Sequence, residues 1–281
     1  MISVFGSTGF IGSRFCELFD REVVRIGRDN YVPKTGEVLY LISTTNNYNV
    51  FDNPNLDIDT NLTVLVDVLK NCKNKGIVFN FVSSWFVYGK NESLPAREED
   101  PCNPKGFYSI TKRAAEQLVI SFCETFKIKY RIFRLGNVYG EGDASVSKKK
   151  NALQYLIGEI IDNKDINLYD GGTNIRDFIY VDDVCRAMKL CMEKSDINNI
   201  VNISNGRPYQ FLSLMEHTRD RAKSKSKFIS VKPTEFHDIV QVKNMYLDTT
   251  KLKKLGFKPK ISIEDGLNIV INHYTKRKDL R

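Results

Sequence analysis

The feature that most constrains the fold is a glycine-spaced turn near the start of the chain. The apolar run Ile2–Phe5 is typical of a buried strand, and the turn Gly6-Ser7-Thr8-Gly9-Phe10-Ile11-Gly12 follows it directly. The amphipathic stretch 11–19 then predicts a helix. A strand, a tight glycine turn and a helix in this order predict the first unit of a parallel sheet.

The spacing of the three glycines also predicts a ligand. The first glycine permits a sharp turn, the second lets backbone N–H groups approach a pyrophosphate, and the third lets the helix lie close on the strand. The helix N-terminus then presents a partial positive charge to the phosphates. We therefore expect a dinucleotide site formed by Gly6, Thr8, Gly9, Phe10, Ile11 and Gly12.

The rest of the first half alternates short apolar runs with amphipathic stretches. Strands are predicted at 22–26, 38–42, 77–82 and 130–135, and helices at 57–73 and 108–126. Strands that are apolar on both faces and separated by helices indicate a parallel sheet covered on both sides. The predicted fold class is α/β, a Rossmann-like doubly wound parallel sheet.

After residue 135 the alternation becomes less regular, and shorter elements predict a smaller α/β substrate-binding lobe at the C-terminus. We assign residues 1–140 and 176–204 to an NAD(P)-binding Rossmann domain. Residues 141–175 and 205–281 are assigned to the substrate-binding lobe.

Composition excludes several classes of protein. In 281 residues, 42% are hydrophobic and 27% are charged, which argues against a disordered or fibrous chain. No run of about 18 apolar residues is present, so we expect no membrane-spanning helix. The six cysteines form no CxxC pair and the three histidines add little, so we expect no metal site. Without a secretory leader, the simplest interpretation is a cytoplasmic protein with free thiols.

The net charge of +8 has two interpretations. Lysine clusters such as 251–254 are either a solvated surface or an attraction for an anionic partner such as a phosphorylated metabolite. No aromatic residues are interleaved with the clusters, so we expect no nucleic acid partner.

The end of the second predicted strand indicates which dinucleotide binds. An acidic residue there accepts hydrogen bonds from the ribose hydroxyls, whereas an arginine favours a 2′-phosphate. This chain has Gly27 at the usual acidic position and Arg28 next to it. We predict NADP(H), with Arg28 on the 2′-phosphate. In the alternative, Arg28 is a solvated loop residue, Asp29 binds the ribose and NAD(H) is possible.

Tyr108 and Lys112 lie four residues apart in a predicted helix and therefore share a face. An ammonium group favours the phenolate, so Lys112 is expected to lower the Tyr108 pKa and allow proton exchange with an alcohol or ketone. Ser83 and Ser84 end the fourth strand, at the sheet edge that faces a ligand crevice. A hydroxyl there can share the substrate oxygen with Tyr108.

These motifs resemble those of the extended short-chain dehydrogenases/reductases, the NAD-dependent epimerase/dehydratase family of nucleotide sugars. The resemblance covers nearly the whole chain in seven blocks: GSTGFIG, SSWFVYG, FYSITKRAAE, RLGNVYGEG, GGTNIRDFIYVDDV, VNISNG and YLDTTKLKKLGFKPK. It implies a nucleoside-diphosphate sugar as substrate, and a homodimer formed through the helices at 57–73 and 108–126.

The resemblance also implies residue roles. Ser84 would be the catalytic hydroxyl, with Ser83 as the neighbouring candidate, and Tyr108 the general acid/base. Lys112 would tune Tyr108 and hold the nicotinamide ribose. Asn137 would contact the substrate near its phosphates and Arg176 would pair with the diphosphate. Alternatively, Asn137 caps a turn and Arg176 forms a surface ion pair.

Departures from the family pattern narrow the reaction. The family's 4,6-dehydratases have acidic residues after the strand-end hydroxyl, where this chain has Trp85 and Phe86. Dehydration and decarboxylation are therefore disfavoured. Trp85 either packs on the sugar or faces the core. The segment 233–240 lacks the arginine often found there, and His237 is either a substitute or a surface residue.

Three functions remain. The first is reduction of a 4-keto nucleoside-diphosphate sugar at carbon 4 by NADPH, which Arg28 favours. The alternative is a nucleoside-diphosphate-sugar 4-epimerase with a recycled NAD(P). The third is a non-catalytic NADP(H)-binding regulator, against which the intact Ser84, Tyr108 and Lys112 argue.

Overall fold

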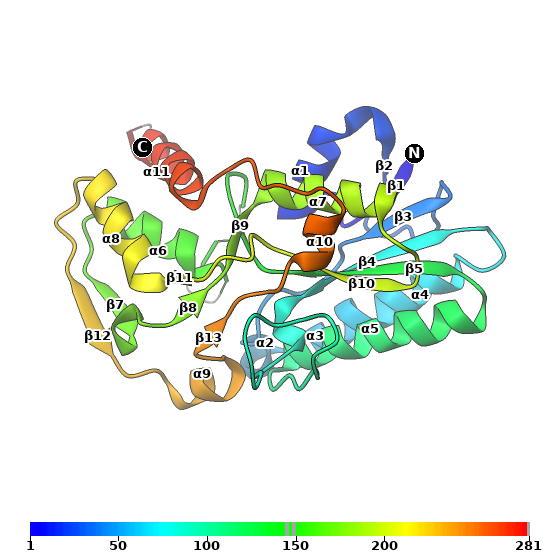
Figure 1. Ribbon diagram of the computed structural model, residues 1–281, viewed down its shortest axis with the longest axis horizontal. Coiled ribbons are helices and arrows are strands. Elements are labelled where there is room, and N and C mark those ends of the chain that lie inside the picture. Colours follow the sequence, from blue (N-terminus) through cyan, green and yellow to red (C-terminus); the bar gives the residue numbers. More distant parts are fainter. Residues whose placement is uncertain (144–145, 148–149, 280–281) are drawn as a thin grey trace.

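The computed structural model describes residues 1–143, 146–147 and 150–279. Its larger part is a six-stranded sheet in the order β10-β5-β4-β3-β1-β2, in which every neighbouring pair is parallel (Figure 1). The strands are β1 (Ile2–Phe5), β2 (Val23–Arg25), β3 (Glu37–Tyr40), β4 (Val78–Ser84), β5 (Lys129–Leu135) and β10 (Asn199–Ile203). The predicted doubly wound Rossmann-like sheet is confirmed.

Successive side chains of each strand point into two separate cores, because side chains alternate across a strand. Val4 and Leu39 belong to the core that also holds helix residues Phe15 and Met188, whereas Phe5 packs in the other core. Helices α1 (Phe10–Leu18) and α7 (Val181–Lys194) cover the first face, and α4 (Val64–Lys70) and α5 (Phe107–Thr125) cover the second (Figure 1). Both faces of the sheet are therefore buried.

The second part of the molecule is a smaller lobe at one end of the sheet (Figure 1). It contains a two-stranded sheet of β7 and β12, a three-stranded sheet of β11, β8 and β13, and four helices. Their bounds are β7 (Ile166–Tyr169), β8 (Ile175–Arg176), β11 (Tyr209–Gln210), β12 (Phe228–Val231), β13 (Asn244–Met245), α6 (Ala152–Ile161), α8 (Phe211–Arg221), α9 (Glu235–Val240) and α11 (Ile263–Asp279). We propose that residues 1–140 and 176–204 form the Rossmann domain and that residues 141–175 and 205–281 form the lobe.

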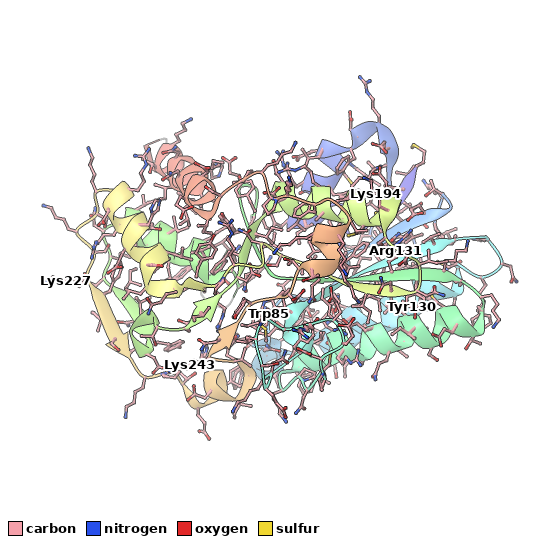
Figure 2. All side chains as sticks on the ribbon, viewed as in Figure 1. Trp85, Tyr130, Arg131, Lys194, Lys227 and Lys243 are labelled. Atoms are coloured by element: carbon pink, nitrogen blue, oxygen red, sulfur yellow. The ribbon has the colours of Figure 1, made fainter. Side chains whose placement is uncertain are left out.

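The remaining elements join the two parts. Strand β6 (Asn137–Tyr139) pairs with β9 (Phe178–Tyr180), and α10 (Thr250–Lys254) packs against β10. The single helix expected over 57–73 is instead α3 (Asn55–Ile58), a π-helical segment (Asp59–Thr63) and α4, with α2 (Asn49–Asp52) before them. Trp85 lies where the sheet and the lobe meet, Lys194 lies on the sheet domain, and Lys227 lies at the outer end of the lobe (Figure 2).

Two further observations concern the described residues alone. No helix among them is long and apolar enough to cross a membrane. None of their His, Cys, Asp and Glu side chains form a group of three that could hold a metal ion.

Candidate active site

A cleft of about 1850 Å³ follows the ends of β1, β3, β4 and β5 and continues beneath the lobe. Pockets for one small ligand are typically about 300–1,000 Å³, so this cleft has room for two. Twelve of the site residues expected from the sequence line it: Gly6, Thr8, Gly9, Phe10, Ile11, Gly12, Ser84, Trp85, Tyr108, Lys112, Asn137 and Arg176. Arg28 does not belong to the lining.

The glycine turn has the geometry expected of a pyrophosphate site. Gly6 has a φ of +79°, a conformation that side chains disfavour, and Gly9 is the N-cap of α1. A Cβ on Gly12 would lie 2.1 Å from the backbone oxygen of Gly6, so only glycine lets α1 approach the turn this closely. The N-terminus of α1 therefore lies against the turn in the cleft lining, which fits a dinucleotide bound at a helix N-terminus.

Arg25, not Arg28, is the arginine that contacts the glycine turn. The Arg25 Nη1 donates a hydrogen bond to the backbone oxygen of Ser7 at 3.2 Å. Arg28 is exposed. The neighbouring Gly27 lies in open space, because a Cβ added to it would meet no atom within 4 Å. The contact of Arg28 with the 2′-phosphate therefore stays a prediction. Arg25, the last residue of β2, was not singled out by the sequence analysis.

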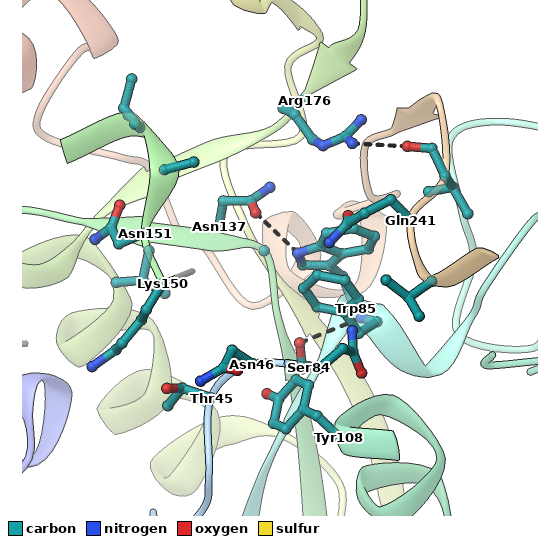
Figure 3. A pocket seen from close by; sticks show the side chains of 18 of the residues that line it. Thr45, Asn46, Ser84, Trp85, Tyr108, Asn137, Lys150, Asn151, Arg176 and Gln241 are labelled. Atoms are coloured by element: carbon teal, nitrogen blue, oxygen red, sulfur yellow. Dashed lines mark hydrogen bonds between the residues drawn. The ribbon is translucent and has the colours of Figure 1, made fainter. Parts of the chain in front are cut away.

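Ser84 and Tyr108 come from different elements and meet at the cleft. Ser84 ends β4 and Tyr108 is the second residue of α5, and Figure 3 shows their hydroxyl groups side by side. Burial raises the pKa of Tyr108 to about 12, and the hydrogen bond with Ser84 opposes this rise in part. Ser83 is more deeply buried than Ser84, so Ser84 is the better placed of the two hydroxyl groups.

Lys112 lies one helical turn after Tyr108 but is bound elsewhere. Its Nζ donates to the backbone oxygen of Val82 at 2.6 Å and lies 4.2 Å from the centroid of the Phe81 ring. Burial lowers the pKa of Lys112 to about 7. The prediction that Lys112 makes the phenol acidic is therefore wrong for the protein alone, because burial favours the neutral form of both groups.

Trp85 and Asn137 form one hydrogen-bonded unit (Figure 3). The Trp85 Nε1 donates to Asn137 Oδ1 at 3.1 Å, and Asn137 Nδ2 donates to the backbone oxygen of Asp177 at 2.9 Å. Trp85 is 3% exposed and packs with Met245 and Leu247. It is therefore a core residue, and it also contributes to the lining of the cleft.

Arg176 places a buried cation in the cleft wall. Its guanidinium donates to the backbone oxygens of Ile175, Val242 and Lys243 at 2.9, 2.8 and 2.7 Å, and the described residues offer it no carboxylate. Burial lowers its pKa to about 10. The guanidinium also lies 5.8 Å from the centroid of the Trp85 ring. A buried guanidinium with no carboxylate partner is suited to an anionic ligand, so the alternative of a surface ion pair is wrong.

His237 also lines the cleft, and its ring centroid lies 4.4 Å from that of Tyr169. Its pKa is lowered, mainly by burial, so a neutral ring is favoured. His237 is therefore a half-buried residue of the cleft wall, packed against Tyr169 of β7, and its role as a substitute for the missing arginine stays a prediction.

Comparisons with known proteins identify the family of this chain and its fold. Residues 37–204 match the model of the NAD dependent epimerase/dehydratase family. A Methanocaldococcus jannaschii protein named "Putative UDP-glucose 4-epimerase" is 29% identical over 242 residues, which cover 84% of this chain and 75% of that protein.

Two solved structures have the same fold along their whole length. UDP-glucose 4-epimerase with UDP-glucose from Thermotoga maritima has a TM-score of 0.87 and 25% identity, and the match covers 100% of this chain and 99% of that one. RMD from Pseudomonas aeruginosa complexed with NADPH has a TM-score of 0.86 and 20% identity, with 98% and 99% covered, and supports the fold alone. Because the family model matches more than half of the chain, this protein belongs to the NAD dependent epimerase/dehydratase family and is an enzyme of the extended short-chain dehydrogenase/reductase type.

Proposed function

We propose that this enzyme is a nucleoside-diphosphate-sugar 4-epimerase that recycles a bound nicotinamide dinucleotide. The observation that carries the proposal is one cleft that joins the glycine turn, the Ser84–Tyr108 pair and the buried cation Arg176. The relatives named as UDP-glucose 4-epimerases support this reaction over 4-ketoreduction.

Each residue then has a task. Tyr108 exchanges a proton with the oxygen on carbon 4 of the sugar, and Ser84 holds that oxygen by a hydrogen bond. Arg176 pairs with the diphosphate, and Asn137 positions Trp85 beside it. Lys112 holds the ribose next to the nicotinamide. When bound, a nicotinamide dinucleotide would supply the acceptor for the hydride that leaves carbon 4 and the donor that gives it back to the other face of the keto sugar.

Two observations favour the second candidate, reduction of a 4-keto sugar by NADPH. The raised pKa of Tyr108 favours the neutral phenol, which is the form that donates a proton to a keto oxygen. Arg25 and Arg28 place positive charge at the end of β2, where an acid would repel a 2′-phosphate.

The two reactions differ in whether cofactor is consumed. Protein incubated with NAD⁺ and UDP-glucose or UDP-galactose should interconvert the two sugars with no net change in nicotinamide absorbance. Stoichiometric loss of NADPH absorbance with a 4-keto nucleotide sugar, and no interconversion, would instead establish the reductase. Cofactor binding without either reaction would support the third function, a non-catalytic NADP(H)-binding regulator.

We also propose a homodimer. Apolar side chains of α3 and α5 are exposed on one surface, and Ile58, Leu62, Phe107, Ile110 and Ala114 line a shallow apolar hollow of about 240 Å³ there. Burial of such a surface against a second copy is favourable.

A further inference from the structure

Asn47 is a buried polar residue in the turn directly before α2, and it lines the cleft. Its side chain is 3% exposed. The residue was not singled out by any sequence motif, and the roles assigned above do not involve it.

The Asn47 side chain contacts the start of α5 from 62 residues away in sequence. Its Oδ1 accepts a hydrogen bond from the backbone N–H of Ser109 at 3.2 Å. Ser109 is the third residue of α5, and its amide is one of the helix-terminal donors that normally bind the N-cap side chain. The N-cap of α5 is Gly106, which has no side chain.

Gly106 also leaves the space that Asn47 needs. A Cβ on Gly106 would lie 2.1 Å from Asn47 Oδ1 and 2.3 Å from Asn47 Cγ. A cap supplied by the N-cap residue itself is therefore incompatible with this position of Asn47. The glycine and the distant asparagine together replace an ordinary N-cap.

The amide that Asn47 binds is next to Tyr108 in the chain. We propose that Asn47 is a positioning residue, which caps α5 from the cleft turn and so sets the Tyr108 hydroxyl against Ser84. The inference rests on the proposed roles of Tyr108 and Ser84. Because small displacements of reacting groups slow catalysis strongly, removal of the cap should act on turnover more than on ligand binding.

The test compares Asn47→Ala with a matched cap variant. Ser262 precedes α11 and its hydroxyl accepts from the Asp265 N–H at 3.1 Å, which is the same type of cap away from the cleft. Asn47→Ala should lower kcat for UDP-sugar interconversion about 10- to 100-fold, with KM and the Kd for NADH changed less than about twofold. Ser262→Ala should lower Tm similarly and leave kcat unchanged. Asn47→Asp keeps the acceptor oxygen and should restore most of the turnover.

Equal kcat values for Asn47→Ala and Ser262→Ala would overturn the proposal, as would a failure of Asn47→Asp to restore turnover. If Asn47→Ala does not fold, Gly106→Ala displaces the Asn47 side chain and should reproduce the loss of kcat.

Two measurements are independent of the substrate. In Asn47→Ala, hydrogen exchange at the Ser109 amide should accelerate at least about tenfold, and a crystal structure should show the Tyr108 hydroxyl displaced from Ser84. A wild type that converts no nucleotide sugar would refute the proposed function, whereas unchanged exchange and an undisplaced Tyr108 would refute the role of Asn47.

Discussion

Burial shifts the pKa values of Tyr108 and Lys112 in opposite directions, because it disfavours the charged form of each side chain. Burial raises the pKa of the phenol to about 12 and lowers that of the ammonium to about 7. The hydrogen bond of Lys112 with Val82 satisfies one of its donors without supplying a countercharge. Near neutral pH the phenol is therefore neutral, whereas Lys112 titrates between its charged and neutral forms.

Replacement of Tyr108 by Phe removes one oxygen and keeps the ring. We expect turnover to fall about 10²- to 10⁴-fold because the proton exchange is lost, with the Kd for NADH unchanged. Steady-state kinetics and fluorescence titration measure the two effects. Tyr130→Phe, outside the cleft lining, is the control and should be fully active. Normal turnover by Tyr108→Phe would remove this residue from the mechanism.

Lys112 predicts a pH dependence of stability. Its pKa is about 7 in the folded protein, against 10.5 for the ordinary side chain. Between these values the unfolded chain binds one more proton, so the Lys112 contribution to the unfolding free energy rises with pH and is lost as the pH falls through 7. Urea denaturation at pH 6, 8 and 10 measures the unfolding free energies of the wild type and Lys112→Met. The value for the wild type should increase relative to that of the variant as the pH rises. A difference independent of pH would contradict this.

Helix α5 carries both of these residues, and its position relative to the sheet is fixed by charge as well as packing. Glu116, one turn after Lys112, forms a two-bond ion pair with Arg134 of β5, at 3.0 and 2.8 Å. Both side chains are buried. The pair therefore fixes the direction of α5 at the point where it crosses the sheet, and Asn47 fixes its start.

The position of helix α1 depends on the absence of a side chain at Gly12. Gly12→Ala places a Cβ 2.1 Å from the Gly6 oxygen, so α1 must move away from the turn. We expect the unfolding free energy to fall by about 1–3 kcal/mol and NADH binding to weaken. Denaturant unfolding and a binding titration measure these changes.

Gly27→Ala is the matched control, because a Cβ there meets no atom within 4 Å. Its stability should change by less than about 0.5 kcal/mol. Equal stability of the two alanine variants would show that the close approach of α1 is unimportant.

For the whole molecule, the apolar surface of α3 and α5 is the feature that predicts assembly. Ile110 is 46% exposed and lines the hollow together with Phe107. Ile110→Glu should convert a dimer into a monomer, because a charge would be buried at the interface. Light scattering after size exclusion gives the mass. Ile229→Glu, 45% exposed on β12, should leave the dimer intact. A wild-type monomer would contradict the proposed assembly.

The long elements of the sheet domain follow from local pattern. The apolar run at the N-terminus and the helix that carries Tyr108 were expected within one or two residues of their observed bounds, because each buries a continuous or periodic apolar face. The lobe was harder to predict. Strands β8, β11 and β13 have two residues each, too few for a pattern, and exist because Arg176 and its neighbours pair with segments far away in the chain.

The sequence by itself determined the sheet domain, the glycine turn and the Ser84, Tyr108 and Lys112 set, because each is encoded by residues close together in the chain. Only the tertiary structure decided the electrostatic state of that set, the burial of Trp85 and Arg176, the contact of Arg25 with the turn, and the cap that Asn47 provides. All of these depend on which distant segments exclude water from a group or offer it a partner. Such contacts leave no periodic signal in the chain that makes them.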